Sequence, residues 1–545
     1  MMNNSDAEAA VPPSNITVTF PPGTKILEDG SRNTGHGDGH LVFIPTPSDD
    51  PDDPLNWSKA RKYINFGIIS WYTFMIFVIL DVGGVCWGIW VELWNTTFND
   101  LNNIYGANLA GLAMGCVLFI PFALKYGRRV VYIFSVTVTL ACTIWMSQVN
   151  GVVSLVLANL FSGLAGAVSE ALVQMTVADI FFVHERGTFN GIYLIMTSAG
   201  AYLGPVASGY MVDGQGWRWL YYWCTIGIAI SFISIVFFYE ETKFVPALTG
   251  QSSTPNPSQI QEPLEDAKDN TVTSVATRTS VIDYTKPMKT YRQRMALFTT
   301  TPGSLSTFLR HGYQPFIVLF TIPSVFLISI IYSGLLAWLS LILVTETAIF
   351  NLPPYSFSAS AVGLLYLAGF TGSLIGAVYG GPLSDWSIVY LAKRNGGIYE
   401  PEMRLYMSLF PMILGPGGIF LYGYTATNGM HWIIPNIGVA IFAFSLVAIS
   451  DNVLTYLLDS YSEILGDILT SLAFVRNGMS TLITFTCAFW IDSLGYQKTI
   501  LSFGFLALAT NLLLLPMIFW GKKLRIMSAP RYARMAAQQF DPRAI

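Results

Sequence analysis

The segment "GIYLIMTSAGAYLGPVASG", residues 191–209, is apolar over its whole length and carries no charged side chain. Small or helix-bending residues recur along it, at Gly191, Gly200, Gly204, Pro205 and Gly209. Small residues let membrane helices approach one another closely, and a proline inside a helix bends it. The segment therefore predicts a membrane-spanning helix that packs tightly against its neighbours.

The rest of the chain has the same apolar character. Of its 545 residues, 52% are hydrophobic and only 11% are charged, against roughly 25% charged in soluble domains. This composition indicates a membrane protein. The five cysteines stand singly in apolar segments, a pattern that fits neither a disulfide framework nor a zinc site. We expect no metal and no other cofactor.

Apolar stretches long enough to cross a bilayer fall into two groups of six. Lipid offers the backbone no hydrogen-bond partner, so each stretch is expected to be a helix. The predicted fold class is an all-α membrane protein with twelve transmembrane helices. The spans are expected near residues 64–91, 106–124, 130–147, 152–182, 188–211, 219–239, 316–344, 359–380, 405–424, 432–458, 468–490 and 498–520.

Polar segments divide the chain into five parts. A polar tail and a polar linker are expected to be largely disordered. The linker ends in the basic segment "KPMKTYRQRMALF", which suits a helix on the membrane surface, although a solvated linker is the alternative. The predicted parts are the N-terminal tail 1–62, a first six-helix bundle 63–240, the linker 241–315, a second six-helix bundle 316–520 and the C-terminal tail 521–545.

Lysine and arginine are concentrated in alternate loops, which sets the orientation. Positive loops stay in the cytoplasm, so we expect both termini and the linker there, in a multi-pass protein of the plasma membrane. The sequon "NTT" at Asn95 then faces outward as a possible glycosylation site. Trp87, Trp90 and Trp94 at the outer end of the first span suit an interfacial belt.

Signatures of enzymes are missing from the sequence. There is no G-x-x-x-x-G-K-[ST] nucleotide loop, no H-E-x-x-H pattern and no Ser/His/Asp arrangement. The chain is therefore not expected to be an enzyme. Paired six-helix halves are typical of gradient-driven carriers that rock about a site near the membrane midplane.

The spacing of Gly191, Gly200, Gly204, Pro205 and Gly209 is similar to the antiporter motif of the major facilitator superfamily, with Ser208 in place of one glycine. Further segments look like those of fungal members: "DDPLNWSKARKY", "HERG" at 184–187, "GWRWLYYW" at 216–223, "EETKF" at 240–244 and "GPLSDW" at 381–386. The chain thus resembles the fungal twelve-span, drug:proton antiporter-like transporters. The resemblance implies two six-helix bundles around a central cavity.

The superfamily's cytoplasmic gate motif is only partly retained. The loop "IPFALKYGRR" keeps Gly127, Arg128 and Arg129, but Leu124 stands where the motif has aspartate. The matching loop in the second half retains Gly381 and Asp385. The resemblance therefore implies a gate latch in the second half only.

Two buried acids are predicted to serve substrate or protons. A charge inside a membrane costs about 2.5 to 3.5 kcal/mol on insertion scales, so each is a functional candidate. Asp81 and Glu170 fall near the midplane and are expected to share a cavity, with Gln174 one turn from Glu170. Glu170 would take up and release a proton as the cavity opens to each side. The alternative is an inert, protonated carboxyl held within its own bundle.

Asp451 and Arg476 share a depth in the tenth and eleventh spans, which predicts a structural charge pair. The alternative is that Asp451 exchanges Arg476 for a cationic ligand or a proton. Asn452 and Tyr456 could add hydrogen bonds in either case.

These residues favour a proton-coupled transporter of small organic molecules. The resemblance implies efflux of xenobiotics or a secondary metabolite. The alternative is uptake of organic cations such as polyamines, which the acidic residues favour. Asn159 replaces an arginine of the family pattern, which weakens the argument for proton antiport. The expected partners are a small-molecule substrate, protons and the lipid bilayer, with no nucleic acid, and the chain is expected to act as a monomer.

Overall fold

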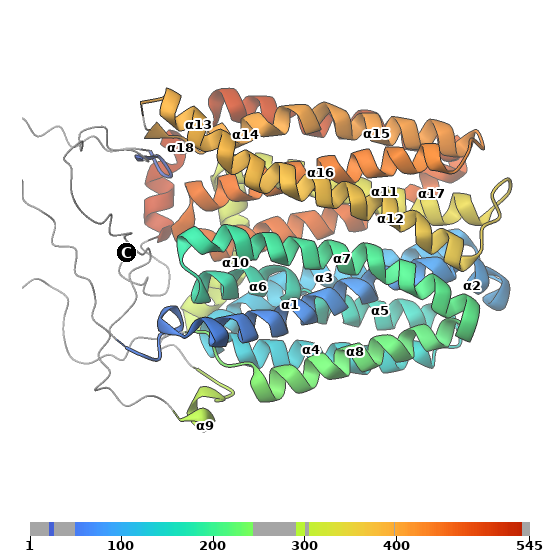
Figure 1. Ribbon diagram of the computed structural model, residues 1–545, viewed down its shortest axis with the longest axis horizontal. Helices are drawn as coiled ribbons and strands as arrows, with labels where there is room; N and C mark the ends of the chain where they lie inside the picture. Colours follow the sequence, from blue (N-terminus) through green and yellow to red (C-terminus); the bar gives the residue numbers. More distant parts are fainter. Residues whose placement is uncertain (1–20, 27–49, 244–289, 300–304, 397, 537–545) are drawn as a thin grey trace, which may run out of the picture.

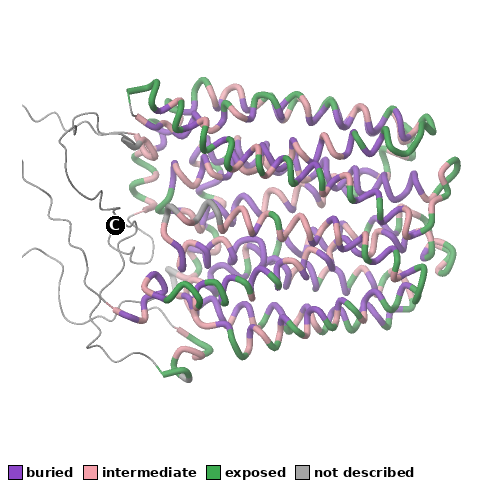
Figure 2. The backbone as a smooth tube through the Cα atoms, in the orientation of Figure 1, coloured by how far each residue is buried: buried purple, intermediate pink, exposed green. Residues whose placement is uncertain are grey.

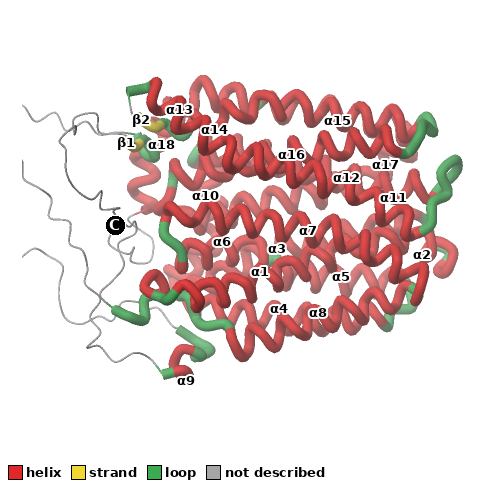
Figure 3. Tube along the Cα trace, in the orientation of Figure 1, coloured by secondary structure: helices red, strands yellow, loops and turns green. Residues whose placement is uncertain are grey.

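The computed structural model describes residues 21–26, 50–243, 290–299, 305–396 and 398–536. Long helices run side by side in two groups, one from each half of the chain. The groups meet where α7 of the first half lies beside α12 of the second (Figure 1). Almost all of the described chain is helical (Figure 3). We call the end where α1 begins and α18 lies the terminal end, and the opposite end, which carries α2, the distal end.

The first half contains the N-terminal bundle. Its elements are η1 (Pro54–Asn56), α1 (Lys59–Asp81), η2 (Val82–Cys86), α2 (Trp87–Trp94), α3 (Phe98–Tyr126), α4 (Arg128–Ser147), α5 (Val152–Gly166), α6 (Val168–Ile180), α7 (Val183–Gln215) and α8 (Trp217–Phe238).

The second half contains the C-terminal bundle. The short helix α9 (Tyr291–Arg294) precedes it and packs against the N-terminal bundle, where the Tyr291 hydroxyl donates to the Phe237 carbonyl. The elements of the second half that follow are α10 (Leu305–Thr321), α11 (Pro323–Asn351), α12 (Ala359–Val378), η4 (Tyr379–Leu383), α13 (Ser384–Arg394), α14 (Glu402–Leu405), η5 (Tyr406–Ser408), α15 (Leu409–Thr427), α16 (Ile433–Ser460), η6 (Ser462–Ile464), α17 (Leu465–Leu512) and α18 (Leu514–Ala536). Strand β1 (Lys25–Ile26) pairs antiparallel with β2 (Ile398–Tyr399) at the terminal end.

The helices follow the predicted spans in order. Within the described residues, 10 helical segments are long and apolar enough to cross a membrane. One of them, Ser462–Ala536, joins two predicted spans across the non-helical Gly495, where φ is 77°. The 33-residue α7 is not among the 10, so its role as a span stays a prediction.

The start of the seventh span differs from the one predicted. The seventh span begins at Pro323 rather than near 316, because residues 305–321 form the separate amphipathic helix α10. The core of the linker, predicted to be disordered, lies outside the described residues.

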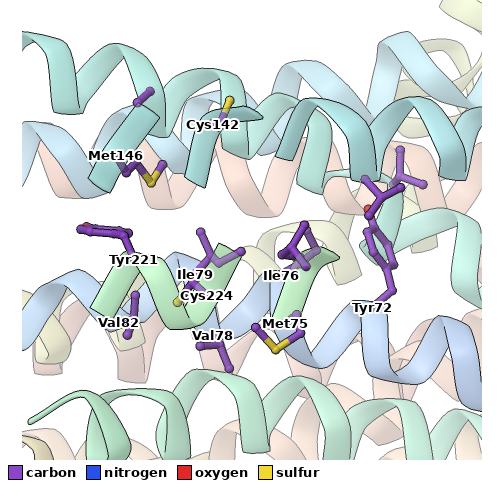
Figure 4. Close-up of a cluster of buried hydrophobic side chains, with 14 of the residues drawn as sticks. Tyr72, Met75, Ile76, Val78, Ile79, Val82, Cys142, Met146, Tyr221 and Cys224 are labelled. Carbon is purple, nitrogen blue, oxygen red and sulfur yellow. The ribbon is translucent and has the colours of Figure 1, made fainter. Parts of the chain in front are cut away.

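Each bundle packs around its own apolar core, and burial is concentrated where helices face one another (Figure 2). In the N-terminal bundle, side chains of α1, α4 and α8 meet in the cluster drawn in Figure 4. Cys142 and Cys224 lie in it as buried free thiols. They act as small apolar side chains there.

The glycines of α7 allow close contact with helices of both bundles. A Cβ at Gly204 would meet Val78 of α1 at 3.2 Å, and one at Gly209 would meet the Ala359 carbonyl of α12 at 2.6 Å. Across the same seam, a Cβ at Gly363 would meet the Pro205 carbonyl at 2.6 Å. The segment that predicted close helix packing therefore forms part of the seam between the bundles.

Candidate functional site

A small cavity lies between the bundles in their distal half. It has a volume of about 30 Å³, enough for about two water molecules. Its wall combines aromatic side chains with one carboxylate. The main lining residues are Asp81, Trp87, Trp90, Tyr105, Asn159, Tyr221, Thr347 and Tyr366. An organic substrate would need the bundles to move apart, so the site is contracted in this conformation.

Asp81 ends α1 where the helix changes to the 3-10 segment η2. Gly83 and Gly84 follow at once, and glycine weakens a helix because it loses more backbone entropy than other residues. The Asp81 side chain is 6% exposed and faces the Tyr105 hydroxyl of α3. An interrupted membrane helix beside a buried charge is typical of binding sites in carriers.

Glu346, from α11 of the other bundle, is a buried acid that the sequence reasoning missed. It is 1% exposed, and neither of its carboxylate oxygens has a hydrogen-bond partner among the described residues. The predicted seventh span ended at residue 344, which placed Glu346 in a loop. Because α11 extends to Asn351, Glu346 lies inside the helix.

Tyr202 and Tyr366 connect the two acids. Each interacts electrostatically with both Asp81 and Glu346. The Tyr366 hydroxyl lies 3.5 Å from Thr347 Oγ1 and would be 3.0 Å from a Cβ at Gly84, so it crosses from α12 to η2. Asp81 and Glu346 thus lie near the same two tyrosines, one acid in each bundle, and we call this region the Asp81–Glu346 site.

Glu170 forms an ion pair across the bundle interface with Arg476 of α17. Asn477 Nδ2 also donates to Glu170 Oε2 at 2.6 Å, and Arg476 Nη1 donates to the Tyr332 hydroxyl at 3.1 Å. The predicted pair of Arg476 with Asp451 is therefore corrected. A shared depth did not determine which neighbouring helix the arginine faces.

Asp81 and Glu170 do not share a cavity. Glu170 Oε2 lies 3.9 Å from Cys116 Sγ, whereas Asp81 faces Tyr105 on the same helix, α3. A rise of 1.5 Å per residue puts Tyr105 and Cys116 about 16 Å apart. The two acids that were predicted to act together have different surroundings.

The other predicted site residues lie away from the cavity. Gln174 is half-buried on α6, one turn beyond Glu170. Asp451 lies beside Gly380 and Gly381 of η4. Asn452 Oδ1 accepts a hydrogen bond from Ser384 at 2.7 Å, and the Tyr456 hydroxyl lies 3.5 Å from Glu402 Oε1. These contacts hold the terminal half of the C-terminal bundle together.

The first gate-motif loop is stabilised by carboxylates from outside the motif. Gly127 has φ of +106°, a conformation that favours glycine. Glu241 accepts hydrogen bonds from the backbone nitrogens of Arg128 and Arg129 at 2.9 and 3.1 Å, at the start of α4. Arg128 Nε also pairs with Asp179 at 3.1 Å. The loop is thus supplied with two carboxylates although the motif aspartate is absent.

Lys243 completes this arrangement at the end of α3. Its ammonium donates to the carbonyls of Leu124, Lys125 and Thr299 at 2.7, 2.9 and 3.1 Å. Burial lowers the pKa of Lys243 to about 8, and nearby Arg128 acts in the same direction. Glu241 and Lys243 therefore anchor the loop between α3 and α4.

The second gate-motif loop is held in a similar way. Asp385 pairs with Arg404 Nη1 at 2.8 Å, and Arg404 Nε pairs with Asp459 at 2.9 Å. These pairs lie within the C-terminal bundle, as the Arg128–Asp179 pair lies within the N-terminal bundle. Neither latch crosses between the bundles in this conformation.

Contacts between the bundles close the distal end. Asn99 Nδ2 donates to the Asp492 carboxylate at 3.2 Å, and the Ser360 backbone nitrogen donates to Asp213 at 3.1 Å. Trp90 is fully buried and Trp87 is 5% exposed beneath this closure. The expectation that these two tryptophans form an interfacial belt is therefore wrong, because they pack inside the protein. Asn95 is exposed at the distal end, and its glycosylation stays a prediction.

Comparison with known proteins gives a family model and several fungal relatives. Residues 63–480 match the family model of the Major Facilitator Superfamily. MFS-type transporter C1271.10c of Schizosaccharomyces pombe is 33% identical, with 91% of this chain and 90% of that protein covered. Protein HOL1 of Saccharomyces cerevisiae is 26% identical, with 93% of each chain covered. MFS-type transporter penM of Penicillium rubens is 30% identical, again with 93% of each covered.

Solved structures agree on the fold. The proton:xylose symporter XylE has a TM-score of 0.57 at 11% identity, covering 85% of this chain and 97% of its own. The human organic anion transporter MFSD10 has a TM-score of 0.54 at 13% identity, covering 84% of this chain and 100% of its own. The chain, with its paired bundles and fungal relatives, belongs to the major facilitator superfamily of membrane transporters.

Proposed function

We propose that this protein carries small organic cations across the membrane by alternating access, in exchange for protons. The observation that supports this most strongly is the Asp81–Glu346 site. Two buried carboxylates from opposite bundles lie there near the same two tyrosines, and within the described chain no basic side chain pairs with either.

The chemistry of this site favours a cation over a neutral or anionic substrate. A buried carboxylate without a partner is costly, and an incoming cation removes that cost as it binds. Tyr202 and Tyr366 surround the site with aromatic rings, which attract ammonium groups. A bound anion would instead increase the cost of the buried carboxylates.

The division of the site between the bundles supports alternating access. Asp81 belongs to the N-terminal bundle and Glu346 to the C-terminal bundle, so rocking of the bundles would separate the two carboxylates. The conformation described here has a closed distal end and a contracted cavity. In our proposal the distal end faces outside and both termini are cytoplasmic, in the plasma membrane.

We propose export, because the glycines of α7 are spaced as in the superfamily's antiporter motif. These glycines form the contacts of α7 with α1 and α12. Exchange against an inward proton gradient would then drive efflux of cationic xenobiotics or a cationic secondary metabolite. Uptake of organic cations such as polyamines is the alternative, since the same acids would serve either direction.

Transport by the purified full-length protein in proteoliposomes tests the proposal. Radiolabelled spermidine and a labelled lipophilic monocation would be followed in both directions with and without a proton gradient. Glu346→Gln and Asp81→Asn should each lower cation transport at least tenfold. Glu92→Gln makes the same change at an exposed position and should not. Unchanged transport in both site variants would refute the assignment, and the direction of proton-driven flux separates export from uptake.

A further inference from the structure

The two carboxylates of the Asp81–Glu346 site lack a counter-charge, and this affects the number of protons that can be bound together with a substrate. Among the described residues, the titratable groups that interact electrostatically with Asp81 or Glu346 are tyrosines. Tyr105, Tyr202 and Tyr366 face Asp81. Tyr202, Tyr366 and Tyr422 face Glu346. A neutral hydroxyl can orient a carboxylate, but it cannot cancel its charge.

Glu170 differs because its charge is already balanced inside the protein. Arg476 forms an ion pair with it, and Asn477 supplies a further donor at 2.6 Å. The buried acids therefore fall into two classes. Glu170 needs nothing from outside, whereas Asp81 and Glu346 need two positive charges when the bundles close over them.

Closure removes the water that would otherwise solvate these charges. The cavity of about 30 Å³ beside Asp81 is too small for a hydration shell around an ionised carboxylate, and Glu346, outside this cavity, is only 1% exposed. Ionised groups without a counter-charge in such a place are disfavoured strongly enough to exclude the state. The closed site must then be filled by protons, by cationic substrate, or by both.

We propose that the closed site is electrically neutral, so that the charges of the bound substrate and the number of bound protons always total two. A dication displaces both carboxyl protons, which leave to the solvent as two O–H bonds break. A monocation displaces one proton and leaves the other carboxyl protonated. The inference rests on the proposed function and adds to it a coupling ratio that depends on the charge of the substrate.

Proton release on binding measures this ratio directly. The full-length protein in detergent would be titrated with butylamine, which carries one charge, and with 1,4-diaminobutane, which carries two. Calorimetry at pH about 6, in buffers of different ionisation enthalpy, gives the protons released per bound ligand. The expected counts are about one for butylamine and about two for diaminobutane.

Variants assign the second proton to its carboxyl. In Glu346→Gln the count for diaminobutane should fall to about one, and its affinity should fall toward that of butylamine. Asp81→Asn should do the same. Glu346→Asp keeps the charge and should keep the count of two, which separates a charge effect from poor folding. The exposed Glu92→Gln should also keep it.

Equal proton counts for the two amines would overturn the neutrality rule while leaving cation transport standing. A count of two for diaminobutane in Glu346→Gln would overturn it as well. If neither amine binds to the folded wild-type protein, the proposed function fails and the rule fails with it.

Discussion

Replacing Arg476 with methionine should weaken the contact between the bundles. The change removes the cation from the ion pair with Glu170, whose side chain is 3% exposed. Glu170 would keep the Asn477 amide at 2.6 Å but no counter-charge. Breaking a buried pair on one side costs about 3 to 5 kcal/mol. Because the Asn477 amide still donates to Glu170, we expect a loss at the lower end of this range, about 3 kcal/mol.

The loss should change the conformation more than the stability of either bundle. Glu170 lies on α6 and Arg476 on α17, so their pair connects the bundles without contributing to the core of one. A difference of about 3 kcal/mol corresponds to roughly a hundredfold change in an equilibrium constant. The population with an open distal end should therefore rise strongly in Arg476→Met.

Distances between spin labels at the distal end measure this change. Asn103 of α3 and Asn428 after α15 are exposed there, in different bundles, and the five buried cysteines can be replaced with alanine to give a clean background. Double electron–electron resonance should show a longer distance in Arg476→Met. A second change, Glu170→Gln, removes the stranded carboxylate and should restore part of the original distribution.

A matched control uses an ion pair inside one bundle. Arg128→Met breaks the pair with Asp179, which is 3.1 Å long and confined to the N-terminal bundle. It should lower thermal stability without lengthening the distal distance. If Arg476→Met gives the parental distance distribution, or if Arg128→Met shifts it equally, the ion pair does not hold the bundles together.

Three further predictions follow from contacts outside the site. Gly209→Ala should lower the yield of folded protein by the 1 to 3 kcal/mol or so typical of overpacking, because its Cβ would meet the Ala359 carbonyl at 2.6 Å, whereas Gly214→Ala, with nothing within 4 Å, should not. Glu241→Gln should cost about 1 to 3 kcal/mol, seen as a lower thermal midpoint, because its carboxylate accepts three backbone hydrogen bonds, from Arg128, Arg129 and Lys243. Arg525→Met should lower that midpoint more, because it strands the buried Glu402, and the double variant with Glu402→Gln should recover part of the loss; no recovery would contradict a charge effect.

The sequence was sufficient for the helices because lipid leaves the backbone no other structure. Apolar length placed the third span at 130–147, and α4 runs from Arg128 to Ser147. It was insufficient where an amphipathic helix adjoins a span. The predicted seventh span, 316–344, includes the end of the amphipathic α10, so it stops short of Glu346 although α11 extends to Asn351.

The depth of a side chain in the membrane could also be estimated from the sequence, but the direction in which it points around its helix axis could not. Arg476 and Asp451 do come from neighbouring spans of one bundle, and their depths were estimated from the rise per residue. The arginine nevertheless faces α6 of the other bundle, where Glu170 supplies its counter-charge. A side chain's partner depends on the rotation of its helix, and α16, whose polar side chains do not form one stripe along the helix, gives little indication of that rotation.

The paired and the unpaired buried acids have different effects on closure of the bundles, and the two effects complement each other. An ion pair between the bundles, such as Glu170 with Arg476, stabilises one conformation whatever the site contains. Carboxylates without a counter-charge, such as Asp81 and Glu346, disfavour closure unless protons or a cation are bound. Closure of an empty, ionised site is thereby penalised, while closure of a filled site is not. A carrier with this combination would avoid uncoupled cycling, because the same charges that select the substrate also control whether the bundles can close.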